Sequence, residues 1–132
     1  MSILTTRRKR SGAGRLTRNS KLFKSIINAI QEKKGENIIS LDHRKIPEAV
    51  ADFFIICEAS SSIQVKAIAD FVEHYAKETA RETPYRSEGQ QSGQWILVDF
   101  INVVVHIMLP ETRKFYKLEE MWSDAEGEEH NA

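Results

Sequence analysis

Apolar residues recur at helical spacing in two segments of the chain. The first segment follows Ser20, which can cap a helix, and ends at Gly35, a residue that tolerates the left-handed backbone found beyond helix C-termini. The second segment, about residues 63–81, follows three consecutive serines. Its apolar positions repeat every three or four residues: Val65, Ile68, Ala69, Val72, Tyr75 and Ala76. The pattern predicts two amphipathic helices, each with one buried face.

Strand patterns lie between and after these helices. Residues 52–59 (DFFIICEA) are almost continuously apolar, which is typical of a strand covered on both faces. The other predicted strands are residues 37–42, 85–87, 95–100 and 103–109. The last two are expected to form an antiparallel hairpin, and a short helix is expected after Pro110. This order predicts an α+β fold, in which helices pack on a mixed β-sheet of about five strands.

The first strand of the hairpin has one apolar face and one mixed face. The apolar face, Ile96, Val98 and Phe100, is expected in the core because alternate residues of a strand share a side. The other face carries an aromatic, an aliphatic and a charged residue: Trp95, Leu97 and Asp99. Such a face suits a contact surface, since tryptophan often anchors interfaces. The alternative is a tryptophan at the rim of the core and an aspartate that faces water.

Charge is unevenly distributed, although the formal net charge of the 132 residues is zero. Residues 1–21 hold seven of the 19 basic residues and none of the 19 acidic ones, so the remainder has 12 basic residues and a net charge of −7. A basic arm favours nucleic acid because binding releases counterions from phosphates. A tail that aids solubility and an organelle transit peptide are the other interpretations. We expect residues 1–19 to be a disordered basic arm, residues 20–125 one domain, and residues 126–132 a disordered acidic tail.

Motifs for catalysis or metal binding are scarce. The four histidines are far apart in the sequence and Cys57 is the only cysteine, so the sequence predicts neither a zinc site nor an internal disulfide. His106 is expected to be a hydrogen-bonded histidine of the sheet. Asp99 lacks the second carboxylate on its face that two-metal nucleotidyl transfer needs. We therefore expect no catalytic residue, cofactor or metal.

An enzymatic alternative stays open, in which Ser60–Ser62, at a helix start after a strand, hold a phosphate. The longest apolar run is too short to cross a membrane, and a single cysteine suits a reducing compartment. These features predict a cytoplasmic location.

Three stretches stand in a specific order: residues 52–73 (DFFIICEASSSIQVKAIADFVE), the pair Glu88–Gly89, and residues 94–122 (QWILVDFINVVVHIMLPETRKFYKLEEMW). In this order and spacing the chain resembles the ribosomal silencing factor family, also called Iojap-like, over about residues 21–125. The resemblance implies a fold similar to nucleotidyltransferases without their catalytic carboxylates. It also implies docking on the large ribosomal subunit, at ribosomal protein number fourteen, which would block joining of the small subunit and repress translation.

The resemblance further implies a set of partner-binding residues: Trp95, Leu97, Asp99, Glu88, Gly89 and Tyr116. Within this set, Glu88 and Gly89 are expected to shape the loop that positions Trp95. Relatives are often dimeric, so a homodimer is among the expectations. Organelle relatives are linked to assembly of the large subunit, and an assembly factor that binds RNA through the basic arm is a further alternative.

Two positions depart from the family pattern. The hairpin turn reads Ile101-Asn102, whereas the family usually has Gly followed by Asp or Asn. A β-branched residue resists positive φ, so we expect a longer loop or a left-handed Asn102. Ile63 stands where the family often has Arg, and contacts of that arginine would be absent.

Overall fold

The structure is a computed structural model that describes residues 20–46, 49–121 and 123–131. Its helices are α1 (Lys21–Glu32), α2 (Ser62–Ala80), α3 (Pro110–Tyr116) and α4 (Leu118–Met121). Its strands are β1 (Glu36–Asp42), β2 (Phe53–Glu58), β3 (Arg86–Glu88), β4 (Trp95–Asp99), β5 (Val103–Met108) and β6 (Glu126–Glu129). The six strands form one sheet in the order β3-β4-β5-β2-β1-β6, in which only β2 and β5 run parallel. The predicted α+β fold with a mixed sheet is confirmed, with six strands where we expected about five.

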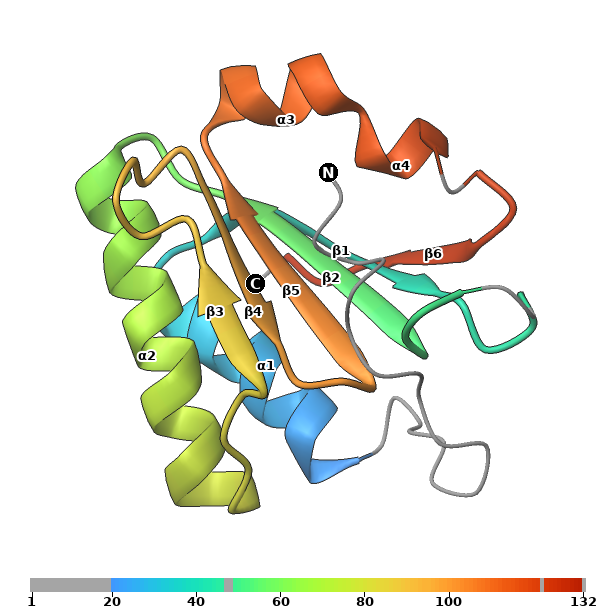
Figure 1. Cartoon of the computed structure of the whole chain (residues 1–132), viewed down its shortest axis with the longest axis horizontal. Coiled ribbons are helices and arrows are strands. Elements are labelled where there is room, and N and C mark those ends of the chain that lie inside the picture. The colour runs from blue at the N-terminus through green and yellow to red at the C-terminus, as the bar shows by residue number, and fades with distance from the viewer. Residues whose placement is uncertain (1–19, 47–48, 122, 132) are drawn as a thin grey trace.

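Both long helices begin where the sequence places them. The Ser20 hydroxyl accepts a hydrogen bond from the Phe23 amide at the start of α1, and the Ser61 hydroxyl accepts one from the Gln64 amide at the start of α2. Such caps satisfy amides that have no partner within the helix. α1 and α2 lie side by side over one face of the sheet (Figure 1). No helix in the described part of the chain is long and apolar enough to cross a membrane.

The two faces of the sheet pack into separate cores. The first core lies under α1 and α2 and includes Ile96, Val98 and Phe100, as predicted. Cys57 lies in the same core, and burial raises the pKa of its thiol to about 12, so it behaves as a small apolar side chain. The second core covers the opposite face: Leu41, Ala51, Phe54, Ile56, Leu97, Val104, Met108 and Leu118.

The acidic stretch after residue 125 forms a strand. β6 pairs antiparallel with β1, from Ile39 opposite Glu129 to Asp42 opposite Glu126. Our prediction of a disordered tail over 126–132 is therefore wrong for residues 126–129, while residue 132 lies outside the described residues, as does the arm 1–19. All four β6 residues are exposed and none is a large apolar residue, so the strand leaves no hydrophobic pattern in the sequence. Backbone pairing with the open edge of β1 holds it in place.

The hairpin turn is tight. Asp99 lies opposite Val104, and the Phe100 amide donates to the Val103 carbonyl at 2.8 Å, which leaves Ile101 and Asn102 as the two loop residues. The left-handed residue is Ile101, with φ of 73°, so our expectation of a longer loop or a left-handed Asn102 is wrong. The reason lies in the neighbouring contacts: the Asp99 carboxylate accepts from the Ile101 amide at 2.8 Å. The Asn102 carbonyl in turn accepts from the Asp52 amide at 2.8 Å, which fixes the peptide after Asn102.

Candidate functional site

Trp95 lies half-buried at the start of β4, where the strand meets α3. Its indole Nε1 donates a hydrogen bond to Nδ1 of His106 on β5, with 3.0 Å between the two nitrogens. Its ring contacts the ring of Tyr116 on α3, with centroids 4.7 Å apart. Trp95 is thus held by one polar and one aromatic contact from two different elements.

His106 is fully buried and neutral. Burial lowers the pKa of its imidazole, with a further contribution from His43, to about 3. A neutral ring that accepts at Nδ1 carries its proton on Nε2. This confirms the prediction that His106 is a hydrogen-bonded histidine of the sheet, and its role in the structure is to orient Trp95.

The loop between β3 and β4 lies against the backbone of Trp95. Gly89 has φ of 98°, and a Cβ atom built there would lie 2.0 Å from the carbonyl oxygen of Trp95. Only glycine fits such a close approach. Glu88, the last residue of β3, is exposed and pairs with Leu97 on β4. The structure therefore places Gly89 directly against the backbone of Trp95, with Glu88 one residue before it on β3.

The helix α3 presents two exposed aromatic side chains beside Trp95. Phe115 is 77% exposed and Tyr116 is 46% exposed, and their rings meet edge to face with centroids 5.0 Å apart. We call Trp95, Phe115 and Tyr116 the aromatic surface. Large aromatic side chains that remain exposed together are frequent anchors of protein interfaces. Sequence reasoning found Tyr116 through the family resemblance and missed Phe115. The one signal for Phe115 is that it is an aromatic residue in a predicted short helix that has no apolar face to bury.

Two of the predicted contact residues are not at the surface. Leu97 and Asp99 share a face with Trp95, as the alternation predicts, but both are fully buried. Leu97 packs in the second core, and the Asp99 carboxylate accepts from the Ile101 amide and lies 3.8 Å from the Arg86 guanidinium. Our prediction that their side chains form part of a contact surface is corrected, because residues from elsewhere in the chain cover this face of β4.

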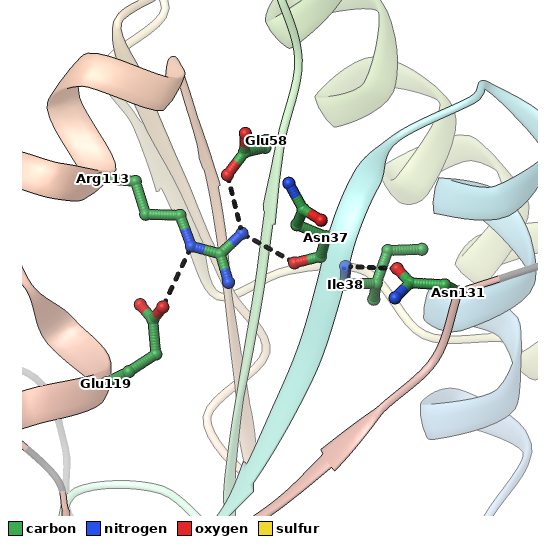
Figure 2. Close-up of polar contacts among 6 residues, drawn as sticks. All are labelled: Asn37, Ile38, Glu58, Arg113, Glu119 and Asn131. Carbon is green, nitrogen blue, oxygen red and sulfur yellow. Dashed lines mark hydrogen bonds and ion pairs between the residues drawn. The ribbon is translucent and has the colours of Figure 1, made fainter.

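A polar network fixes α3 to the sheet (Figure 2). One guanidinium nitrogen of Arg113, Nη1, donates to the Asn37 carbonyl at 2.7 Å and to the Glu58 carboxylate at 3.2 Å. Its Nε donates to the Glu119 carboxylate, also at 3.2 Å. Arg113 thus joins α3 to β1, β2 and α4 at once. Sequence reasoning missed this residue, because its partners on the sheet, Asn37 and Glu58, are distant in the sequence.

The parts of the enzymatic alternative lie apart. Ser61 follows the end of β2, whereas Asp99 is level with the beginning of β2, since Asp99 pairs with Val104 and Val104 with Phe54. Ser61 serves as the cap of α2. Near that end of β2 the carboxylates of Glu58 and Glu119 are both engaged by Arg113. Within residues 20–46, 49–121 and 123–131, no three His, Cys, Asp or Glu side chains gather as a metal site.

Comparisons with known proteins connect this geometry to a family. A crystal structure of a protein from Chromobacterium violaceum superposes with a TM-score of 0.73 and 40% sequence identity, covering 77% of this chain and 83% of that one. "Ribosomal silencing factor RsfS" of Halalkalibacterium halodurans is 38% identical over 107 residues, which cover 81% of this chain and 90% of that protein.

A mouse protein is a more distant relative. "Mitochondrial assembly of ribosomal large subunit protein 1" is 38% identical over 74 residues, which cover 54% of this chain and 32% of the mouse protein. The sequence model of the family described as "Ribosomal silencing factor during starvation" matches residues 17–132. With a match over nearly the whole chain and a shared fold, the protein belongs to the ribosomal silencing factor family.

Proposed function

We propose that this protein represses translation by docking on the large ribosomal subunit and blocking the joining of the small subunit. The observation that carries the proposal is the aromatic surface, which lies exposed on a member of the ribosomal silencing factor family. The partner is ribosomal protein number fourteen of the large subunit, as the resemblance of the sequence implies. The mechanism is steric, so no catalytic group is required.

The aromatic surface has the properties of a binding anchor. Trp95 is held by His106 and Tyr116 before any partner arrives, and an anchor that is already ordered loses less conformational entropy on binding. Tryptophan and tyrosine are the residue types most often found to carry binding energy at interfaces. Outside residues 1–21 the chain carries a net charge of −7, which attracts a basic ribosomal protein and steers the encounter.

The test is co-sedimentation of the purified protein with purified large subunits, followed by a subunit-joining assay. We expect binding at physiological salt and a fall in the fraction of joined ribosomes as the protein is added. If the wild-type protein stays unbound, the proposal fails. If it binds but joining is unchanged, the steric mechanism fails although docking stands.

A second candidate function is assistance in assembly of the large subunit. The name of the mouse relative favours it, and so does the basic composition of residues 1–21. An assembly role predicts that the protein binds incomplete large subunits more tightly than mature ones. Equal sedimentation with both, together with inhibition of joining, favours repression instead.

Two further expectations accompany the proposal. We expect action in the cytoplasm, and we expect the docked form to be either the monomer or one subunit of a homodimer. Analytical ultracentrifugation of the free protein and of the complex measures which form binds.

A further inference from the structure

Strand β1 contains a bulge close to α3. In the register of β1 with β2, Asn37 and Ile38 together face the single residue Cys57. Two residues that face one define a β-bulge, which takes backbone groups out of the regular ladder. Asn37 has φ of 49°, a left-handed conformation that asparagine tolerates better than most residues. The bulge raises the question of where its backbone groups find hydrogen-bond partners.

One peptide unit of the bulge is held from both sides by side chains. The Asn37 carbonyl accepts from Nη1 of Arg113 at 2.7 Å, and the amide of the same peptide unit, that of Ile38, donates to Oδ1 of Asn131 at 3.0 Å. The carbonyl and the amide of a trans peptide point in opposite directions. Arg113 and Asn131 therefore approach β1 from opposite sides, as Figure 2 shows.

The position of α3 depends on the Arg113 side of this arrangement. α3 buries none of its own residues, and Tyr116, which contacts Trp95, stays 46% exposed, so apolar packing alone holds the helix only weakly against the sheet. The Arg113 side chain is only 11% exposed and ties α3 to the bulge, to Glu58 and to Glu119. Phe115 and Tyr116 follow Arg113 within the same helix. Any movement of the Asn37 carbonyl therefore changes the support of the aromatic surface.

On the other side of the bulge, hydrogen bonds of the neighbouring residue His130 hold Asn131 in place. The neighbouring residue His130 donates its amide to the Ile38 carbonyl at 2.9 Å, and its own carbonyl accepts from the Gln31 side chain at 2.7 Å. The His130 imidazole Nε2 lies 2.7 Å from the Ser40 hydroxyl. These contacts continue the β6–β1 pairing to His130 and bring Asn131 to the bulge.

We propose that Asn131 is a positioning residue for the aromatic surface, acting through the Asn37–Ile38 peptide and Arg113. A hydrogen bond to the amide of a peptide polarises its carbonyl, which strengthens the bond that the carbonyl accepts. Loss of the Asn131 contact leaves the Ile38 amide without this acceptor, and the bulge relaxes. The Asn37 carbonyl then shifts away from Arg113, and α3 loosens. The role in docking rests on the proposed function, whereas the link from Asn131 to α3 does not.

The test first compares three matched variants in the full chain. Asn131→Leu removes the acceptor at nearly constant size, Asn131→Asp keeps an acceptor oxygen at the same position, and Glu129→Gln changes an exposed side chain of β6 nearby. Amide hydrogen exchange is measured without ribosomes at the Lys117 amide, which bonds to the Arg113 carbonyl at 3.0 Å. The reference is the amide of Val72 in the middle of α2.

We expect Asn131→Leu to accelerate exchange in α3 on the order of five- to tenfold, the effect of one lost hydrogen bond, with the Val72 amide unchanged. We expect Asn131→Asp to restore slow exchange and Glu129→Gln to have no effect. Arg113→Lys, which replaces the planar guanidinium by a single ammonium group, should accelerate amide exchange in α3 as well. In the double variant that combines Asn131→Leu with Arg113→Lys, the two accelerations of exchange should not multiply, because both substitutions act on the Asn37–Ile38 peptide unit.

Binding to purified large subunits then tests the role in docking. We expect Asn131→Leu to weaken binding by a factor similar to its effect on α3 exchange, and Asn131→Asp to restore it. Three results would overturn the link from Asn131 to α3. They are equal acceleration of exchange at Lys117 and Val72, no acceleration at Lys117, and effects that multiply in the double variant. Unchanged binding by Asn131→Leu would overturn the role in docking. If the wild type does not bind at all, the proposed function fails together with that role, while the exchange data still decide the link.

Discussion

The indole nitrogen of Trp95 donates to Nδ1 of the buried, neutral His106 across the β4–β5 pair, over 3.0 Å. The two side chains lie on the same face of the sheet, on neighbouring strands. Trp95 thereby gains a fixed orientation at the border between the second core and the surface. Because the acceptor is a ring that resists protonation, this orientation is maintained at neutral pH.

Stability should fall as the pH is lowered from about 6.5. His106 has a pKa near 3 in the folded protein and the ordinary value of 6.5 when unfolded, so between these values the unfolded state binds the extra proton. The free energy of unfolding should therefore decrease on acidification by up to about 1.4 kcal/mol per pH unit from this group. Above pH 6.5 the group contributes no pH dependence. Urea denaturation at a series of pH values measures the slope.

The control for this prediction is His106→Asn, which keeps an acceptor near the position of Nδ1 and cannot titrate. It should be less stable than the wild type at pH 7, because a smaller side chain leaves a cavity. Its stability should nevertheless depend less on pH between 4 and 6. Equal slopes for the wild type and His106→Asn would contradict the assignment.

Trp95→Ala should weaken binding to the large subunit by about 2 kcal/mol, or roughly 30-fold in Kd, as expected for a central aromatic anchor. Tyr116→Ala should have a smaller effect in the same direction, since Tyr116 both supports Trp95 and is itself 46% exposed. Titration of labelled protein with purified large subunits gives the two affinities.

Tyr85→Ala is the matched control for these substitutions. Tyr85 is an aromatic residue that is 53% exposed, and its amide bonds to the Asp99 carbonyl at the far end of β4. Its removal should leave the affinity within about twofold, as for most surface residues outside a hot spot. A loss as large as that of Trp95→Ala would place the contact elsewhere on the molecule.

The elements with a buried periodic face could be predicted from the sequence, whereas the fully exposed strand β6 could not. α1, α2 and the β4–β5 hairpin have apolar residues at regular spacing, and all are present where expected. β6 (EGEE) has no apolar side chain and is held by backbone pairing with β1. Since backbone groups are the same in every residue, such a strand leaves no signal in the pattern.

The site was predicted in part for a related reason. The alternation along the strand places Trp95, Leu97 and Asp99 on one face, and the structure agrees. The alternation does not tell whether other parts of the chain cover that face. The covering residues, such as Ala51 and Leu118, lie far away in the sequence. Trp95 remains accessible because it lies at the end of the strand. Arg113 could not be predicted either, since its main partner is a backbone carbonyl that a bulge exposes.

Removal of residues 1–19 should weaken binding to large subunits and make it less sensitive to salt. The deletion removes six basic residues: Arg7, Arg8, Lys9, Arg10, Arg15 and Arg18. Each phosphate contact that is lost should reduce the slope of log K against log salt by about 0.7 to 0.9. Replacement of the six residues by Gln in the full chain should give the same result, if charge is responsible. An unchanged slope in both variants would exclude a contact of these residues with ribosomal RNA.

Ile101→Gly should stabilise the protein. Ile101 has φ of 73°, a left-handed conformation that is strongly unfavourable for a β-branched residue, and a strained residue of this kind costs about 1 to 3 kcal/mol. Glycine removes that strain, but its unfolded chain is more flexible, which offsets roughly 0.5 to 1 kcal/mol. Because Ile101 is only partly buried, little apolar packing is lost. The net gain in the free energy of unfolding should be about 1 kcal/mol, measured by urea denaturation.

Asn102→Gly is the matched control: Asn102 does not have positive φ, so glycine there relieves no strain and should lower stability slightly. A gain at Asn102 and none at Ile101 would show that the strain lies in the other loop residue.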